Sequence, residues 1–421
     1  MNEVTENKIE RAILVALKTK DVNHFIVDEH LAELEMLTET AGAETILKVV
    51  QDRPRPDKAY YLGKGKAEEV AELIELNDID LVIFDADLAP TQVRNLEKLM
   101  DRKIIDRSGL ILDIFAAHAK TKQAKTQVEL AQLQYILPRL TRAWTHLSKQ
   151  HGGIGTKGPG ETQIETDRRL IRTRISKLKE NLKKIESQNR TKSLKRKEFL
   201  TASIVGYTNA GKSTLINLLT DADVLAENKL FATLDSTTRS LEIDKSKQIM
   251  ISDTVGFIRK LPHNLIESFK STLNVVRDSD VILHVIDISN PFFEDHIQVV
   301  NQTLKELGCE DKTLLHLFNK VDNLSDKSRL EYINNKYENS IVISAVRGIN
   351  ISTVKEKLIE IYESNYKEKS ITLNSVQSKL VSQIHSLAEV IKTEYIDDKV
   401  TVVYKTDKAN HSKIERLLNQ G

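Results

Sequence analysis

Hydrophobic and polar residues alternate over short distances in the first part of the chain, and this pattern predicts a small α/β unit. Short β-rich runs occur at 13–17, 45–50, 81–84 and 103–105. Two of the stretches between them, 68–76 and 91–100, have the periodicity of helices. Because strands that alternate with helices usually pair in parallel, we expect a largely parallel sheet between residue 9 and about residue 115.

The next stretch has two apolar stripes with helical spacing, which predict a helical hairpin. The first stripe consists of Leu130, Leu133, Leu137, Leu140, Trp144 and Leu147, and the second of Ile164, Ile171, Ile175, Leu178, Leu182 and Ile185. Both stripes advance in steps of three, four or seven residues, as the buried face of a packed helix does. The segment between them, HGGIGTKGPG at 151–160, carries five of the fifteen glycines. We therefore expect two antiparallel helices joined by a flexible tip, with Pro138 kinking the first.

The rest of the chain predicts two further units. Apolar strands at 202–205, 249–251, 281–286, 314–318 and 341–343 are separated by helical spans, which indicates a doubly wound, mostly parallel α/β domain. The last 55 residues contain a helical stretch at 376–391, a strand at 400–404 and a terminal helix, as a small α+β unit would. We divide the chain into an N-terminal α/β subdomain (1–118), a basic helical hairpin (119–197), the doubly wound domain (198–366) and a C-terminal α+β domain (367–421).

Charge is distributed unevenly along the chain, although its formal net charge is only +1. Residues 139–197 contain 17 Lys and Arg against 5 Asp and Glu, a local balance of +12. This concentration favours a polyanionic partner for the hairpin alone. The alternative is that it forms an ordinary solvated basic coiled coil.

Composition excludes several classes of protein. Cys309 is the only cysteine, so neither a disulfide framework nor a cysteine zinc site can form, and a reducing compartment is expected. No stretch approaches the roughly 18 apolar residues that a spanning helix needs. We expect a soluble, cytoplasmic protein without stable membrane insertion.

A phosphate-binding loop is predicted directly after the strand at 202–205. The loop consists of Gly206, Tyr207, Thr208, Asn209, Ala210, Gly211, Lys212 and Ser213, and Thr214 continues into the following helix. Glycines let backbone N–H groups approach phosphates, Lys212 offers charge to the β- and γ-oxygens, and Ser213 offers a hydroxyl to Mg²⁺. The pattern arises by chance in about one or two chains per hundred of this length. The other motifs along the chain therefore decide whether this loop binds a nucleotide.

A second motif, Asp253-Thr254-Val255-Gly256, follows the next strand. There Asp253 can hold Mg²⁺ through water, and the Gly256 N–H can reach the γ-phosphate. A plain surface turn is the alternative.

Base recognition is predicted at two later strand ends, which carry Asn319, Lys320, Val321 and Asp322, and then Ser344, Ala345 and Val346. The Asp322 carboxylate can accept N1–H and N2–H₂ of guanine, and the Ala345 N–H can donate to O6. Adenine would leave Asp322 unpaired, at a cost on the order of 1 to 3 kcal/mol. The ligand is therefore expected to be GTP or GDP. Capped turns would explain each motif alone, but not their order.

The hydroxyl-rich segment 231–239 is the expected γ-phosphate-sensing loop, and it includes Phe231, Ala232, Thr233, Leu234 and Asp235. A threonine that binds Mg²⁺ only beside a γ-phosphate would order this loop. Thr233 is chosen as the Mg²⁺ ligand together with Ser213, while Thr237 and Thr238 stay as alternatives. Lys212, Thr233 and Gly256 are the candidate catalytic residues.

Two departures from common GTPase patterns concern hydrolysis. Phe257 stands where many GTPases place a glutamine that orients the attacking water, so slow intrinsic hydrolysis and stimulation by a partner are expected. Asn209 occupies a position similar to the potassium-coordinating asparagine of GTPases that lack this glutamine. We hypothesise that K⁺ assists hydrolysis.

Residues outside the nucleotide motifs make the chain resemble the HflX family in the broad Obg-related group, from about residue 10 to 366. They are TQVRNLEKL at 91–99, RSGLILDIFA at 107–116, QVELAQL at 127–133 and GGIGTKGPGETQIETDRR at 152–169. The resemblance implies binding to the large ribosomal subunit and its rRNA, with the glycine-rich tip near the peptidyl-transferase region. It also implies splitting or rescue of stalled ribosomes under stress. A basic hairpin with Lys157 at its tip suits rRNA phosphates. We expect a monomer that does not bind DNA.

Other functions remain open at this stage. The protein could instead act in large-subunit assembly, or it could remodel RNA with ATP through residues 1–195. The glycine- and lysine-rich segment at 63–66 is a candidate second anion site, since some family members are said to use ATP there, but a turn before a helix explains it more simply. His151 has no nucleophile or metal partner in the sequence and is expected to be structural or to face RNA.

Overall fold

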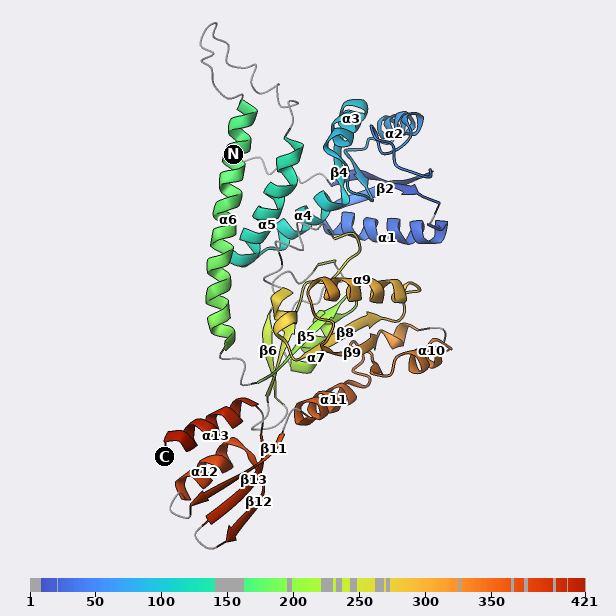
Figure 1. Cartoon of the computed structure of the whole chain (residues 1–421). Coiled ribbons are helices and arrows are strands. Elements are labelled where there is room, and N and C mark those ends of the chain that lie inside the picture. The colour runs from blue at the N-terminus through green and yellow to red at the C-terminus, as the bar shows by residue number, and fades with distance from the viewer. Residues whose placement is uncertain are drawn as a thin grey trace, which may run out of the picture.

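The computed structural model describes most of the chain, in four parts (Figure 1): the N-terminal sheet and the helical hairpin lie side by side at one end, the central domain follows, and the C-terminal part lies at the other end. The described residues are 9–20, 22–140, 163–194, 199–220, 230–231, 237–242, 248–261, 269, 273–324, 326, 328–364, 367–374, 378–396, 399–406 and 408–420. The α/β class with a mostly parallel central domain, which the sequence predicts, is confirmed. Among the described helices none is both long enough and apolar enough to span a membrane.

The N-terminal part is a four-stranded parallel sheet in the order β2-β1-β3-β4. Its strands are β1 (Glu10–Lys18), β2 (Ala43–Asp52), β3 (Leu81–Phe84) and β4 (Lys103–Asp106). Helices α2 (Lys64–Leu76) and α3 (Pro90–Met100) pack on one face, and α1 (His24–Thr40) and α4 (Arg107–His118) on the other. Because both faces are covered, the two inner strands β1 and β3 contain continuous buried apolar runs.

Two of these helices, α1 and α4, are not among the helices expected from the sequence. Helix α4 is buried over most of its length, so it lacks the polar face that reveals a helix by periodicity. Helix α1 has a weak apolar stripe that includes the buried Glu33. Both helices face the central domain. Because they are covered there as well as by their own sheet, they lack the clear division into an apolar and a polar face from which a helix is predicted.

Two helices form the predicted hairpin, α5 (Lys122–Ile136) and α6 (Gln163–Leu194). Leu130 of α5 packs against Leu178 and Leu182 of α6, which confirms that the two predicted stripes meet. Pro138 lies in a 3-10 turn, η1 (Leu137–Arg139), so the α-helix ends where a kink was expected. The expected tip at 151–160, with His151 and Lys157, lies outside the described residues, as do Trp144 and Leu147.

The central domain has a six-stranded sheet in the order β10-β9-β8-β5-β7-β6, parallel except for β6. The strands are β5 (Leu200–Gly206), β6 (Thr238–Glu242), β7 (Gln248–Asp253), β8 (Val281–Asp287), β9 (Thr313–Asn319) and β10 (Ser340–Val342). The remaining elements are α7 (Lys212–Thr220), α9 (Phe293–Glu306), η5 (Val321–Asn323), α10 (Ser328–Lys336) and α11 (Ile351–Ser364). The expected strands are all present. The additional strand β6 lies at the edge of the sheet and buries only Leu241. Its sequence therefore contains no apolar run from which the strand could be predicted.

The C-terminal part is an antiparallel sheet in the order β11-β13-β12. Its elements are β11 (Lys367–Asn374), α12 (Ser378–Leu387), β12 (Glu389–Ile396), β13 (Lys399–Thr406) and α13 (Lys408–Gln420). The helix expected over 376–391 is therefore wrong at its end, because α12 stops at Leu387. Val390 and Thr393 are β-branched and pair with β13 instead, and Ile391 lies at an irregularity in that pairing. Figure 1 places this part at the opposite end of the central domain from the N-terminal sheet.

Candidate nucleotide-binding site

The predicted motifs gather at one edge of the central sheet, at the carboxyl ends of β5, β7 and β9. Parallel strands bring their ends to the same edge, where doubly wound folds bind ligands. The loop from Gly206 to Gly211 leads directly into the N-terminus of α7, which begins at Lys212. Exposed N–H groups at such a helix start favour an anion.

The conformation of this loop depends on residues that accept positive φ angles. Gly211 has φ +93°, and a side chain there would bring its Cβ to 2.3 Å from Asn319 Nδ2. Asn209 has φ +60°, a conformation that asparagine tolerates better than most residues. The loop is therefore shaped by its own backbone and pressed against the β9 end.

Lys212 is buried beneath the loop. Its Nζ donates to the Tyr207 carbonyl oxygen at 2.8 Å. Burial lowers the pKa of Lys212 to about 8, and nearby Lys320 adds to this effect, whereas Asp253 opposes it. A phosphate bound at this loop would pair with the buried ammonium group and stabilise its charged form.

Asp253 ends β7 and is fully buried. One carboxylate oxygen accepts the Thr254 backbone N–H at 2.9 Å, and the Thr254 hydroxyl donates to Ile204 O at 2.6 Å. These bonds fix the strand end beside β5. Asp253 thus lies close enough to Lys212 to interact with it electrostatically. Lys212 is the first residue of α7, the helix that also carries Ser213.

The residues after Asp253 lie directly against the phosphate-binding loop. Thr208 N–H donates to Phe257 O at 2.8 Å, and Phe257 N–H donates to Gly206 O at 3.1 Å. A Cβ on Gly256 would lie 3.0 Å from Lys212 Nζ and 2.9 Å from Thr208 Cγ2. Only glycine allows this close approach, which puts the Gly256 backbone beside the lysine.

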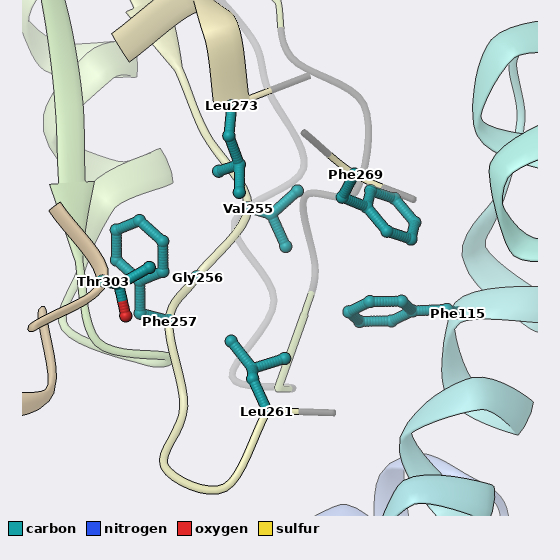
Figure 2. Close-up of a pocket in the computed structure, with 8 residues that line it drawn as sticks. All are labelled: Phe115, Val255, Gly256, Phe257, Leu261, Phe269, Leu273 and Thr303. Carbon is teal, nitrogen blue, oxygen red and sulfur yellow. The ribbon is translucent and has the colours of Figure 1, made fainter. Parts of the chain in front are cut away.

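Phe257 itself points away from this contact. Its ring is buried in a cluster with Val205, Leu273 and Val276. Figure 2 shows it among the residues that line a small apolar cavity of about 20 Å³. Phe257 therefore supplies packing, and its apolar side chain has no group that could orient a water molecule by hydrogen bonding.

Asn319 joins the phosphate-binding loop to the loop after β10. Its Nδ2 donates to Ala210 O at 2.8 Å, and its Oδ1 accepts Ala345 N–H at 2.9 Å. The neighbouring Lys320 has φ +64° and pairs with Asp287 at 2.8 Å. The predicted phosphate and base motifs are thus held together by one amide.

Asp322 lies beside the loop that contains Ser344, Ala345 and Val346. Its side chain is only 10% exposed, and its Oδ1 has no hydrogen-bond partner among the described residues. The nearest cation is Arg347, whose Nε lies 3.9 Å from Oδ2. A buried carboxylate oxygen without a donor is costly unless a ligand supplies one, and guanine would do so.

Part of the expected γ-phosphate-sensing loop cannot be placed. Ala232, Thr233, Leu234 and Asp235 lie outside the described residues, so Thr233 stays a prediction. Of the two alternatives, Thr238 already belongs to β6 and shares a hydrogen bond with Ser252 Oγ at 2.9 Å. Thr237 precedes that strand, and its carbonyl accepts Asp253 N–H at 2.9 Å.

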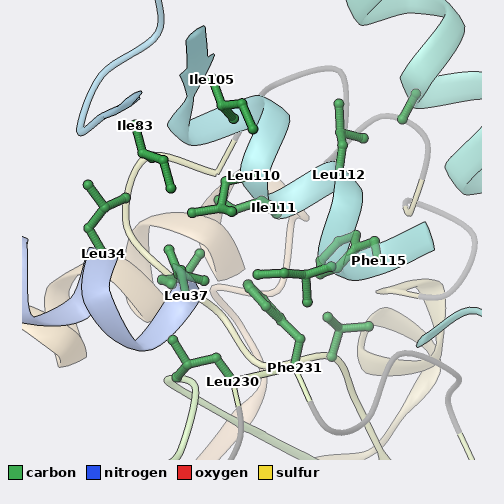
Figure 3. Packing of buried hydrophobic residues seen from close by; sticks show 14 of the residues in the cluster. Leu34, Leu37, Ile83, Ile105, Leu110, Ile111, Leu112, Phe115, Leu230 and Phe231 are labelled. Carbon is green, nitrogen blue, oxygen red and sulfur yellow. The ribbon is translucent and has the colours of Figure 1, made fainter. Parts of the chain in front are cut away.

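The start of this loop is anchored in the N-terminal part, a contact that the sequence does not indicate. Phe231 is buried with φ +57°, and its ring meets Phe115 of α4 edge-on, with centroids 4.7 Å apart. Figure 3 shows both rings in one cluster with Leu37 of α1. The N-terminal part and the nucleotide loops therefore share a hydrophobic core.

Charged residues add a second connection that the sequence analysis missed. Arg259 pairs with Glu29 at 3.1 Å and with Glu33 at 3.3 Å, both on α1. Lys260 donates to Asp85 Oδ2 at 2.8 Å. Neither basic residue belongs to a motif, so only their position directly after the glycine motif could have drawn attention to them.

The glycine- and lysine-rich segment at 63–66 forms the N-cap and first turn of α2. Gly63 N–H donates to Gln51 Oε1 at 2.8 Å. Lys66 pairs with Glu69 on the same helix at 2.6 Å. These local bonds agree with the simpler expectation of a turn that begins a helix.

Models of known families match most of the chain. Residues 28–116 match the GTP-binding GTPase N-terminal family, 118–196 the GTP-binding GTPase middle region, and 201–320 the 50S ribosome-binding GTPase family. The ranges follow the N-terminal sheet, the hairpin and the nucleotide motifs in turn.

Curated relatives are similar over most of their length. GTPase HflX from Lacrimispora saccharolytica is 44% identical over 410 residues, which cover 96% of this chain and 95% of the relative. GTPase HflX from Flavobacterium psychrophilum is 50% identical over 313 residues, 74% of this chain and 76% of the relative. The Escherichia coli GTPase HflX is 40% identical and covers 93% and 92%. A crystal structure of a GTP-binding protein from Sulfolobus solfataricus with GDP is 26% identical, with a TM-score of 0.45, and covers 84% and 98%.

Proposed function

The chain belongs to the HflX family of GTP-binding, ribosome-associated GTPases, and on that premise we propose that it binds the large ribosomal subunit and splits or rescues stalled ribosomes. Hydrolysis of GTP to GDP and phosphate is the activity of the family. The finer proposal concerns what that hydrolysis is used for. We also propose that the protein acts as a monomer in the cytoplasm.

The observation that carries the proposal is the position of the basic hairpin relative to the nucleotide loops. Helix α4 leads directly into α5, the first helix of the hairpin, and α4 also contacts Phe231 through Phe115. Residues 139–197 have a local charge of +12, which suits the phosphates of rRNA. An RNA-binding element thus continues directly from the helix that contacts the γ-phosphate-sensing loop.

We assign the nucleotide contacts within the same proposal. Lys212 neutralises the β- and γ-phosphate oxygens, and Gly256 N–H donates to the γ-phosphate. The Asp322 carboxylate accepts hydrogen bonds from guanine. The hydroxyls of Ser213 and Thr233, with Asp253 acting through water, are oxygen donors that suit Mg²⁺. The buried Asp253 carboxylate beside Lys212 fits such a cation. When bound, Mg²⁺ would supply charge neutralisation at the phosphates.

Purified protein mixed with intact ribosomes tests this function. Light scattering would follow subunit separation with GTP or with a non-hydrolysable analogue. Separation with both nucleotides, but not with a Lys212→Ala variant, is expected if binding drives splitting and hydrolysis serves release. Intact ribosomes throughout, together with accumulated precursor particles in cells that lack the protein, would instead favour a role in assembly. Activity that survives loss of Lys212 and needs ATP would favour RNA remodelling.

A further inference from the structure

Tyr207 is the second residue of the phosphate-binding loop, but its side chain reaches the N-terminal part. Its hydroxyl donates to Glu33 of α1. The same oxygen accepts the Arg259 backbone N–H at 3.1 Å. Its ring stacks on His296 of α9, with centroids 3.7 Å apart and planes within 6°. One buried side chain therefore connects the loop, the segment after the glycine motif and two helices.

The hydroxyl belongs to a closed circuit of contacts that is buried except at Lys260. Glu33 also pairs with Arg107 of α4, and Arg107 donates to Asp85 at 2.7 Å. Asp85 in turn accepts from Lys260, which adjoins Arg259 in the chain. The circuit thus returns to the segment that Tyr207 holds. Charged groups away from water are stable only while each keeps its partner, so displacement of one affects the rest.

The protonation of these groups keeps the direction of the hydrogen bonds constant. Burial raises the pKa of Tyr207 well above its ordinary value, and the neighbouring Glu33 raises it further. Burial also disfavours charge on Arg107, but Glu33 and Asp85 more than offset this and raise its pKa. The phenol therefore stays a donor to Glu33, and its lone pair stays available to the Arg259 N–H.

The segment between the nucleotide and this circuit is short. Gly256, whose N–H is assigned to the γ-phosphate, is three residues before Arg259. The small apolar cavity lies directly behind Val255 and Gly256 (Figure 2). Among the described residues no side chain fills this cavity, so few packing contacts on that side oppose a shift of the backbone. A movement of Gly256 toward or away from phosphate would therefore reach the Arg259 N–H.

We propose that the Tyr207 hydroxyl is a positioning group for hydrolysis, which holds the segment 256–260 beside the nucleotide and passes its displacement to Glu33 on helix α1. The hydroxyl does not touch the reacting atoms. It acts through the Arg259 backbone on one side and through a charged partner on the other. The N-terminal part would sense the nucleotide through this side chain, which acts together with the ion pairs of Arg259 and Lys260, and it would do so independently of any ribosome.

The test compares Tyr207→Phe with a matched control, Tyr135→Phe, in the full-length protein. The first variant keeps the ring and its stacking but removes the hydroxyl. Tyr135 also donates from a buried hydroxyl to a carboxylate, at 2.7 Å to Asp106, but its contacts lie within the N-terminal part and the hairpin. Both substitutions remove a hydrogen bond from a tyrosine hydroxyl to a carboxylate. Tyr207→Phe also removes the acceptor of the Arg259 N–H, and this second bond is the feature that the control lacks.

Two measurements separate positioning from structural support. We expect Tyr207→Phe to lower kcat for GTP about three- to tenfold, the loss expected for one hydrogen bond, while KM changes less than about twofold. Hydrogen–deuterium exchange of residues 24–40 should differ between the GDP form and the form with a non-hydrolysable GTP analogue. That difference should be clearly smaller in Tyr207→Phe, in which the ion pairs of Arg259 remain, and it should persist unchanged in Tyr135→Phe.

A second variant, Glu33→Gln, removes the negative charge that pairs with Arg107 and Arg259 but keeps an oxygen that can accept the Tyr207 hydroxyl. It should also reduce the nucleotide-dependent exchange of α1. The proposal is overturned if Tyr207→Phe keeps both the kcat and the nucleotide-dependent exchange of the parent protein. It is also overturned if Tyr135→Phe lowers kcat to the same extent, because the hydroxyl of Tyr207 would then act only through general stability.

Discussion

The Asn319 side chain donates to the Ala210 carbonyl at 2.8 Å, so the residue that begins the base motif supports the backbone of the phosphate-binding loop. Its other amide atom accepts from Ala345. The loops that are predicted to bind the base and the phosphates therefore belong to one hydrogen-bonded unit. A substitution in one of these loops should therefore alter the conformation of the other.

Gly211→Ala should abolish tight GTP binding. The new Cβ would lie 2.3 Å from Asn319 Nδ2, and the residue would keep a φ of +93°. Asn319 would have to move, which breaks both of its bonds, while backbone strain adds on the order of 1 to 3 kcal/mol. Isothermal titration with GDP and GTP would measure the loss of affinity.

Gly308→Ala is the control for that substitution. Gly308 has φ +70°, but no atom lies within 4 Å of the point where a Cβ would be, so only backbone strain applies. Thermal unfolding should show a modest loss of stability, on the order of 1 kcal/mol, with unchanged nucleotide affinity. Equal GDP affinity in the two variants would mean that Gly211 is not needed for the Asn319 bridge.

Asp322→Asn should remove the preference for guanine. The amide can no longer accept two N–H donors, and the loss is on the order of 1 to 3 kcal/mol, or roughly 5- to 150-fold in affinity. Binding of xanthosine diphosphate should improve, because xanthine offers a carbonyl where guanine offers an amino group. Competition titrations with GDP, ADP and xanthosine diphosphate would measure both changes. Asp326→Asn, which alters an exposed carboxylate on the same side of the domain, should leave all three affinities unchanged.

Lowering the pH should destabilise the central domain through His284. Burial, together with nearby His316 and Lys212, lowers the pKa of His284 to about 3. An unfolded chain would protonate this histidine below about pH 6.5, whereas the folded one would not. Stability is therefore lost as the pH falls below about 6.5, by about 2 kcal/mol between pH 7 and pH 5.

Urea unfolding at pH 7 and pH 5, monitored by circular dichroism, would measure this loss. In His284→Asn the drop between the two pH values should be smaller by about 2 kcal/mol, because no titrating group remains at that position. The same pH dependence in both proteins would show that acid destabilisation comes from other groups.

Hydrolysis should be faster in K⁺ than in Na⁺ if Asn209 helps to hold a monovalent cation beside the phosphates. Asn209→Gly preserves the positive φ at this position but removes the side-chain oxygen. The variant should therefore hydrolyse GTP at the same rate in both salts, near the rate of the parent in Na⁺. Phosphate release at constant ionic strength provides the measurement, and equal rates for the parent protein would count against the cation.

Much of the nucleotide site could be predicted from the sequence because its chemistry resides in short segments. The glycines, Lys212 and Asp322 stand at strand ends, and parallel pairing brings strand ends to one edge of the sheet. Neither step requires knowledge of long-range packing. The core strands were predictable for a similar reason, since strands covered on both faces are continuous apolar runs.

Only the tertiary structure decided which side chains leave the site and what they contact. Phe257 and Tyr207 both belong to nucleotide loops, but one is buried in the central core and the other reaches Glu33. The docking of α1 and α4 and the partners of Arg259 also appear only when distant segments meet. The physical reason is that the backbone conformation of a loop depends on its own residues, whereas the burial and pairing of a side chain depend on surfaces contributed by other parts of the chain.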